Sequence, residues 1–203
     1  MPNTSQGPQK KRTNVLGRPR AFCADAALRA ILEVFWQKGF AATSIDDLVA
    51  ATQLSRSSLY ACFGSKHALM LAAVALYADE RFQDFQQIAK AQHQQPLEAA
   101  QKILAAITDA DGDRRGCLLM NCIVELAPHD AALAQFSRSH IERVGRLLTE
   151  LLIAGGMPDA TAGGKAGAML AIAIGIITLR KAGMAAPDLR ELLAHADALL
   201  VSA

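Results

Sequence analysis

The chain has 203 residues, 52% of them hydrophobic and 20% charged, and its formal net charge is +2. This composition provides enough apolar material for one or two small domains and excludes a disordered chain. The four cysteines show no CxxC spacing, so they indicate neither a zinc site nor a disulfide framework.

Basic residues are concentrated at the beginning of the chain. Residues 1–20 contain five lysines and arginines and no acidic residue, and residues 1–66 hold nine basic against four acidic side chains. The remaining residues hold twelve basic against fifteen acidic ones. A polyanionic partner at one end would explain this asymmetry, and a solvated, disordered tail is the alternative. Because residues 1–20 show neither a helical period nor an apolar secretion signal, we expect a flexible basic arm on a cytoplasmic protein.

Helical signals begin after the arm. Between residues 21 and 154 alanine is abundant, glycine and proline are few, and strand-like alternation is hard to find. A first helix is predicted from about residue 25 to Gly39, because apolar residues recur there at i, i+3, i+4 and i+7. The chain as a whole is therefore expected to be all-α.

Three capping signals follow in quick succession. Thr43 and Ser44 each have an aspartate three residues later, so either can begin a short helix with a capping box. Ser55 can cap a second short helix over about residues 55–62. Ser65 can cap a long helix that runs to about residue 91.

The first helix and the two short helices after it lie behind the basic arm, and a tight turn joins the two short ones. This is the layout of a helix-turn-helix DNA-binding unit. In the second short helix, Leu59 and Phe63 must be buried to hold the unit together. The remaining side chains then face outward, at the end of the helix that enters the major groove. They are Arg56, Ser57, Ser58 and Tyr60. Arg56 can reach a guanine edge or a phosphate, and short hydroxyl side chains allow a close approach to DNA.

Three segments occur in order within about residues 17–75, namely "GFAATSI", "LSRSSLYACF" and "GSK". In sequence and spacing they resemble the N-terminal domain of TetR-family transcriptional regulators. Two residues depart from that pattern. Gln53 stands at the turn where the family usually has glycine, and a left-handed backbone there would cost a non-glycine residue about 1–2 kcal/mol. Cys62 stands where a histidine or tyrosine commonly contacts a phosphate.

The resemblance implies DNA contacts for nine residues. They are Arg18, Arg20, Thr43, Ser44, Arg56, Ser57, Ser58, Tyr60 and Lys66. The two arginines of the arm would follow the minor groove or the phosphates, and Thr43 with the N-terminus of its helix would hold a phosphate. Tyr60 and Lys66 would each contact another phosphate. The alternatives are a core position for the Tyr60 ring and simple helix capping for Thr43.

Five further helices are expected in the rest of the chain. They cover about residues 96–109, 117–127, 129–153, 159–182 and 187–202, with a charged loop at 109–116. The chain then divides into the arm (1–20), a helix-turn-helix domain (21–81) and a C-terminal ligand-binding and dimerisation domain (82–203).

The helix at 159–182 is apolar around much of its circumference, so we expect it to be central or to lie against a partner. Its longest apolar run, residues 166–179, covers roughly 21 Å, less than the ~30 Å of a membrane core, so no membrane is expected. Gly167 and Gly175 permit close approach of another backbone. With residues 187–202 this helix would form half of a four-helix bundle in a homodimer, which the TetR resemblance also implies. A central helix in a monomer is the alternative.

A ligand pocket is expected among the middle helices, lined by apolar side chains and a few polar groups. The candidate residues are Met120, Asn121, Ile123, Val124, Glu125, Phe136 and His140. Asn121 and Glu125 lie at i and i+4 on one helix face, where they bind something polar if they point inward and are solvated if they point outward. Nothing in this half indicates catalysis, a cofactor or a metal, since the neighbours His129 and Asp130 lack further ligands.

Cys117 follows two arginines at an expected helix N-terminus, and both features favour the reactive thiolate. A redox or electrophile switch through Cys117 is therefore an alternative sensing mode. The commoner role of a helical cysteine is that of a small buried hydrophobe, and the apolar residues after Cys117 favour this role.

These patterns predict a one-component transcriptional regulator. It would be an all-α homodimer that acts as a repressor on a pseudo-palindromic operator in double-stranded DNA and is released by a small-molecule effector. An all-α carrier or a small enzyme would explain the C-terminal helices equally well, but leaves the basic arm and the recognition-helix pattern unexplained.

Overall fold

The computed structural model describes residues 19–201, with side chains described from residue 25 to residue 195. All regular elements in this range are helices, so the predicted all-α fold is confirmed. They are α1 (Pro19–Lys38), α2 (Ile45–Thr52), α3 (Arg56–Phe63), α4 (Lys66–Ala91), α5 (Pro96–Thr108), α6 (Leu118–Leu126), α7 (Ala131–Ala154), α8 (Asp159–Ala182) and α9 (Ala186–Val201). Arg18 and the side chain of Arg20, both expected in the basic arm, lie outside the described residues.

The helix boundaries match the expected ones to within about two residues, except at α1. This helix begins at Pro19, well before the expected start near residue 25. Proline suits the first turn of a helix because its fixed φ is helical and its missing N–H would have no partner there. Residues 19 and 20, expected in the arm, are therefore helical.

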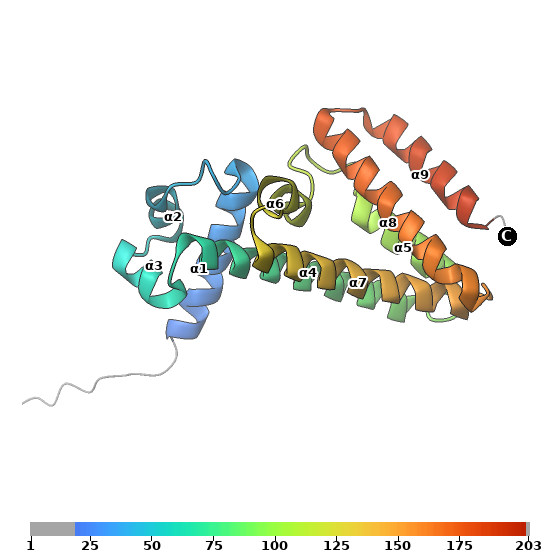
Figure 1. Ribbon diagram of the computed structural model, residues 1–203, viewed down its shortest axis with the longest axis horizontal. Coiled ribbons are helices and arrows are strands. Elements are labelled where there is room, and N and C mark those ends of the chain that lie inside the picture. Colours follow the sequence, from blue (N-terminus) through green and yellow to red (C-terminus); the bar gives the residue numbers. More distant parts are fainter. Residues whose placement is uncertain (1–18, 202–203) are drawn as a thin grey trace, which may run out of the picture.

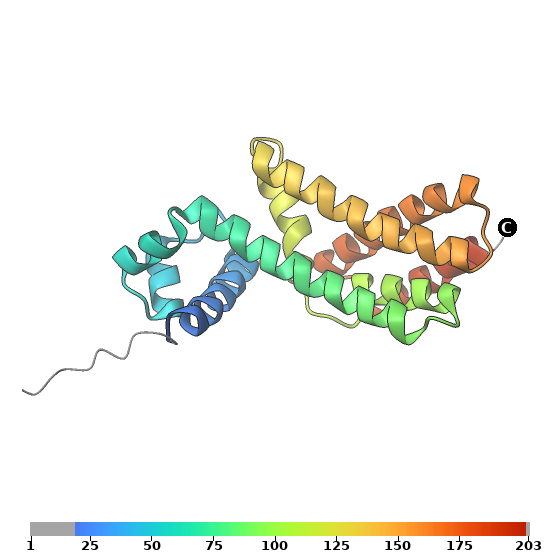
Figure 2. The same ribbon diagram turned by 90° about the horizontal axis from the view of Figure 1, so that it is seen from below.

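The helices form two parts joined by α4. Figure 1 shows α1, α2 and α3 as a compact unit at one end of the molecule. The view from below shows that α4 starts in this unit and extends into the C-terminal helices (Figure 2). α5 and α7 pack against α4, α8 packs against α5 and α7, and α9 lies beside α8. α6 lies between the two parts, in contact with α1, α4 and α7.

Each part has its own cluster of buried side chains. The first cluster joins α1–α4 with α6 and includes Leu48, Leu59 and Leu69, all fully buried. The second lies between α4, α5, α7 and α8 and includes Phe85 of α4. Full burial of one such side chain contributes about 1.5–3 kcal/mol. α4 contributes to both clusters, so the expected domain boundary at residues 81–82 falls inside one continuous helix.

α8 has a buried face and an exposed face. The buried face carries Ala162, Ala166, Met169, Ala173 and Ile176. Opposite it, the glycines of α8 are exposed, and a Cβ built on any of them would meet no atom within 4 Å. Within the described range, α8 by itself or the bent pair α3–α4 would be long and apolar enough to span a membrane, a test that buried core helices also pass. Because its glycine face is exposed, α8 is not a central helix of the single chain.

Candidate nucleic-acid interface and ligand cavity

The start of α2 is fixed by a capping box. Ser44 is the N-cap, and its Oγ accepts a hydrogen bond from the Asp47 N–H at 3.1 Å. In return, Asp47 Oδ2 accepts from the Ser44 N–H at 2.8 Å. Asp47 also pairs with Lys38 of α1 at 2.6 Å, and the hydrogen bonds from Lys38 and Ser44 lower the pKa of Asp47 to about 2. The predicted capping box is confirmed, with Ser44 as its first residue.

Thr43 lies inside the turn between α1 and α2. It is only 2% exposed, and its Oγ1 donates to the Gly39 carbonyl at 2.6 Å. The hydroxyl thus closes the turn in the DNA-free chain, and a contact of Thr43 with a phosphate stays a prediction. Ser44 is exposed at the N-terminus of α2, where a phosphate can be bound.

The turn between α2 and α3 contains a left-handed residue. Gln53 has φ 58° and ψ 16°, and its N–H donates to the Val49 carbonyl at 2.9 Å, which closes α2. Its side-chain Nε2 donates to the Ala50 carbonyl at 2.6 Å. The sequence places a non-glycine residue in the conformation that glycine adopts most readily.

α3 presents hydroxyl groups at its N-terminal end. Ser55 is the N-cap, and its Oγ accepts from the Ser58 N–H at 3.1 Å. The Ser55 Oγ also lies 2.9 Å from the hydroxyls of both Ser57 and Ser58. Leu59 is fully buried on the other side of the helix, whereas Tyr60 is 40% exposed. Tyr60 is therefore not a core ring, and its hydroxyl is available to a phosphate.

Two basic side chains border this surface. Arg56 Nη2 contacts Asp46 Oδ1 of α2 at 2.6 Å, and this hydrogen bond raises the pKa of Arg56. An exposed ion pair is weak, so the guanidinium can exchange Asp46 for a base edge or a phosphate. Lys66, at the start of α4, lies with its Nζ 4.4 Å from the centroid of the Phe40 ring.

The residues expected to line a ligand pocket do not surround a single cavity. Met120 and His140 line a cavity in the middle of the chain. Phe136 lines a separate surface hollow with His140, and its ring stacks on the imidazole at a centroid distance of 6.4 Å. Ile123 packs against the first core cluster.

Asn121 and Glu125, the two polar candidates on α6, do not line the middle cavity. Asn121 and Glu125 line a groove between α1, α6 and α8, together with Val124, which is 82% exposed. Asn121 Nδ2 donates to the Arg115 carbonyl at 2.8 Å, and its Oδ1 accepts from Lys181 Nζ at 2.6 Å. Glu125 accepts from two backbone amides of the α1–α2 turn. Both side chains bind other parts of the protein, so they are neither inside the middle cavity nor simply solvated.

The middle cavity lies between α4, α5, α6, α7 and α8 and has a volume of about 80 Å³. Its lining is mostly apolar, and the apolar residues are Phe85, Ile107, Leu119, Met120, Ile141, Val144, Leu170, Ile174 and Ile177. Its polar groups are Tyr77, Arg81, Cys117 and His140. An apolar chamber with a few convergent polar groups is the usual form of a small-molecule site.

Burial keeps two of these polar groups neutral. It raises the pKa of Tyr77 well above its ordinary value, and the adjacent Cys117 adds to the effect. Burial and the nearby charge of Arg143 lower the pKa of His140 to about 4. The guanidinium of Arg81 donates to the Ala106 carbonyl and lies 5.4 Å from the Phe85 ring centroid. Tyr77, Arg81 and Phe85 follow one another at i, i+4 and i+8 on α4, so they share one face of that helix. None of the three is among the pocket residues expected from the sequence.

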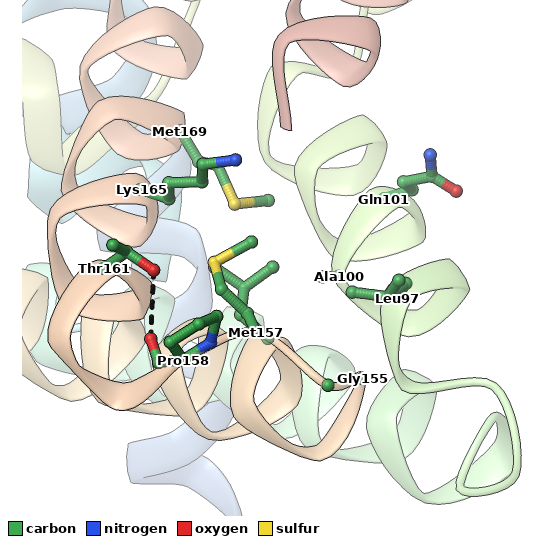
Figure 3. Close-up of a pocket in the computed structure, with 11 residues that line it drawn as sticks. Leu97, Ala100, Gln101, Gly155, Met157, Pro158, Thr161, Lys165 and Met169 are labelled. Atoms are coloured by element: carbon green, nitrogen blue, oxygen red, sulfur yellow. Dashed lines mark hydrogen bonds between the residues drawn. The ribbon is translucent and has the colours of Figure 1, made fainter. Parts of the chain in front are cut away.

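A second cavity lies farther from α1–α3. It has a volume of about 330 Å³, and its described lining comes from α5, α7, α8 and the α7–α8 loop. Met157, Met169 and Lys165 face Leu97 and Gln101 of α5 across it (Figure 3). Thr161 at its edge donates to the Pro158 carbonyl at 3.0 Å. This cavity is larger, but it does not reach α4 or α6, the helices that adjoin the DNA-binding unit.

Cys117 is the N-cap residue of α6 and is half-buried in the lining of the middle cavity. Cys122, one turn further along α6, is buried, and that burial raises the pKa of its thiol to about 12. A thiol with this pKa is not a thiolate near neutral pH, so Cys122 is a poor partner for a redox reaction with Cys117.

Asp130 has a structural role. Its Oδ1 caps α7 by accepting from the Leu133 N–H at 3.0 Å, and its Oδ2 lies 2.5 Å from His67 Nε2 of α4. His129 takes no part in these contacts. Within residues 25–195, we find no group of three or more histidine, cysteine or acidic side chains that could hold a metal ion.

Comparison with known proteins agrees with this geometry. The model of the family described as bacterial regulatory proteins, tetR family, matches residues 27–73. The HTH-type transcriptional repressor ComR of Escherichia coli (strain K12) is 33% identical over 147 residues, 67% of this chain and 66% of ComR. The repressor BdcR of the same organism is 43% identical over 60 residues, 30% of each chain. These matches span less than two thirds of the relatives' own length.

Solved structures share the fold. A cysteine-substituted variant of the TetR family regulator CifR, in complex with a 26-base-pair operator, superimposes with a TM-score of 0.76. The two chains are 24% identical, and the superposition covers 89% of this chain and 98% of the other. A TetR regulator from Chloroflexus aurantiacus J-10-FL gives a TM-score of 0.78 at 22% identity, covering 90% of this chain and 97% of the other.

Proposed function

The chain belongs to the TetR family of bacterial regulatory proteins, and on that premise we propose that it binds a pseudo-palindromic DNA operator as a homodimer, acts as a repressor in the cytoplasm, and is released by a small molecule. The family consists of transcriptional regulators, which are not enzymes.

The outward end of α3 is the observation that carries the proposal. Three hydroxyls and Arg56 lie together there, on a helix whose opposite side is locked into the core by Leu59. In the DNA-free chain, the ion pair with Asp46 holds the Arg56 guanidinium beside α2, and DNA can replace Asp46 in this contact. Arginine paired with guanine O6 and N7 is the commonest specific contact in the major groove. The alternative of a carrier or small enzyme leaves this surface unexplained.

The exposed face of α8 supports a dimer. Its glycines leave the backbone open, and Ile174 on the same face is 38% exposed. A helix face that is apolar, exposed and rich in glycine can pack closely against a second copy of itself. Two copies joined through α8 and α9 would present two α3 helices, as a pseudo-palindromic operator requires.

The middle cavity supports a small effector. At about 80 Å³ it is well below the roughly 300–1,000 Å³ of common ligand sites, so a ligand must push the surrounding helices apart. Arg81, Tyr77 and His140 favour a mostly apolar compound that carries one polar or anionic group. Such a compound releases DNA only if it binds the expanded state more tightly than the DNA-bound state.

Replacing Arg56 tests the proposed reading surface. We expect Arg56→Ala to weaken binding to a specific operator by about 1–3 kcal/mol and to relax the preference for one base pair. The measurement is fluorescence anisotropy with the operator and with duplexes changed at single positions. Arg138→Ala, which removes an exposed arginine from α7, serves as the matched control.

Equal weakening on all duplexes would place Arg56 on a phosphate instead of a base. If Arg56→Ala and Arg138→Ala both bind like the wild type, the assignment of α3 as the reading helix is contradicted.

A further inference from the structure

The carboxylate of Glu125 joins α6 to the turn between α1 and α2. Its Oε2 accepts from the Phe40 N–H at 3.0 Å, and its Oε1 accepts from the Ala41 N–H at 2.7 Å. These residues are more than eighty positions apart in the chain. Hydrogen bonds from amides to an ionised acceptor are stronger than those between neutral groups. One side chain of α6 thus holds two successive backbone groups of the DNA-binding unit.

The turn is shaped to receive this carboxylate. Gly39 has φ +78°, and a Cβ at this position would lie 3.1 Å from Glu125 Oε2. Successive backbone N–H groups after a left-handed residue form a concave anion-binding site. Here the anion is supplied by the chain itself. The same turn is closed from within by the Thr43 hydroxyl, which donates to the Gly39 carbonyl.

The other end of α6 is also fastened to α1. Trp36 Nε1 donates to the Gly116 carbonyl at 3.2 Å, just before α6 begins. The Arg115 guanidinium lies 4.3 Å from the Trp36 ring centroid and pairs with Glu33 at 2.7 Å. Because both ends of α6 are held, a movement of α6 must be transmitted to α1 and to the turn that follows it.

The face of α6 away from this joint lines the middle cavity through Leu119 and Met120. A ligand larger than about 80 Å³ therefore presses on the helix that carries Glu125. The turn held by Glu125 leads within three residues to Ser44, the N-cap of α2. In Figure 1, α6 lies between the α1–α2 turn and the helices around the cavity.

We propose that Glu125 is a positioning residue for DNA binding: its carboxylate holds the amides of Phe40 and Ala41 so that α2 and α3 are correctly placed, and displacement of α6 withdraws it. This proposal deepens the function proposed above and rests on it. Loss of the carboxylate frees the α1–α2 turn, and the operator must then order the turn again on binding.

Three full-length variants test the proposal. Glu125→Ala removes both acceptors, whereas Glu125→Gln keeps one acceptor oxygen but places an amide donor opposite the other N–H. Glu142→Ala is the matched control, because it removes an exposed glutamate from α7 without touching the turn. Operator affinity is measured by fluorescence anisotropy, and exchange of the amides at residues 40–41 by hydrogen–deuterium exchange in the DNA-free protein.

We expect Glu125→Ala to weaken operator binding about tenfold and Glu125→Gln about threefold, in the order of the hydrogen bonds lost. Exchange at residues 40–41 should accelerate in the same order, and Glu142→Ala should match the wild type in both measurements. A general loss of structure would not be rescued in part by glutamine.

Wild-type exchange at residues 40–41 in Glu125→Ala, or operator binding as tight as that of the wild type, would overturn the proposal. If the wild type binds no operator, the proposed function fails. The exchange measurement still decides whether Glu125 holds the turn.

Discussion

The α2–α3 turn has Gln53 at a position where glycine is the usual residue. Gln53 adopts φ 58°, where its Cβ crowds the following carbonyl oxygen. Its side chain offsets part of this strain through the hydrogen bond to the Ala50 carbonyl. The resemblance to a glycine-containing turn predicts this conformation, and the structure confirms it.

Gln53→Gly should increase the free energy of unfolding by about 0.5–1 kcal/mol, because glycine adopts the left-handed region without strain. Urea denaturation of the purified protein measures the change. Gln53→Ala is the control, since it keeps the strain and removes only the side-chain hydrogen bond. Equal stability of the glycine and alanine variants would show that the turn is not strained at this position.

His140 makes stability depend on pH. Its pKa is about 4 in the folded chain, mainly because of burial, against about 6.5 for an unperturbed histidine. Between these values the unfolded chain binds more protons, so the free energy of unfolding should fall as the pH is lowered from 6.5 to 4. Below the folded pKa, this contribution stays constant.

His140→Gln should remove this part of the pH dependence, as measured by urea denaturation at a series of pH values. His93→Gln is the matched control, because it removes an exposed histidine that does not line the cavity. A slope that persists in His140→Gln would assign the dependence to another group.

At the scale of helices, the unoccupied face of α8 is the feature that the single chain does not explain. Gly175 is exposed on that face, and a side chain added there meets nothing within 4 Å inside the chain. A larger residue there clashes with nothing inside the chain, so any steric effect must come from a contact with a second molecule. This separates an effect on assembly from an effect on folding.

Gly175→Leu should convert the protein from a dimer at micromolar concentration into a monomer or an aggregate, because the added side chain overpacks the interface. Sedimentation velocity reports the state, and circular dichroism checks that the helices remain. Gln87→Leu adds an exposed leucine to α4 as the control. A wild-type protein that sediments as a stable monomer would refute the dimer.

Helix positions were largely predictable, because local signals determine them. Ser44, Ser55, Ser65 and Asp130 each cap the helix that follows, and Pro158 stands directly before α8. The start of α1 at Pro19 is less predictable from the sequence, because Arg18, the residue before it, is not of a helix-capping type.

The ligand cavity was less predictable, because it depends on how helices are rotated against one another. Asn121 and Glu125 share a face of α6, but only the packed structure shows that this face meets α1. Tyr77 and Arg81 lie on α4, which also carries the core of the DNA-binding unit, so their place in the cavity depends on α7 and α8.

At the scale of the whole molecule, α4 and α6 connect the reading surface to the cavity. α4 carries buried residues of both core clusters, and α6 contacts α1 on one side and the cavity on the other. Driving an operator from almost fully bound to almost fully free requires about a 10⁴-fold difference in effector affinity between the two states. An effector that requires the cavity to expand would bind the expanded state more tightly than the closed state, and operator release would depend on the size of that difference.

The central claim is that this chain reads a specific DNA sequence. Fluorescence anisotropy of the full-length protein, titrated into the duplex upstream of its own gene and into a shuffled duplex of equal composition, tests it most directly. At physiological salt we expect the upstream duplex to bind about a thousandfold more tightly or better. Equal affinity for the two duplexes, or no binding to either, would contradict the claim.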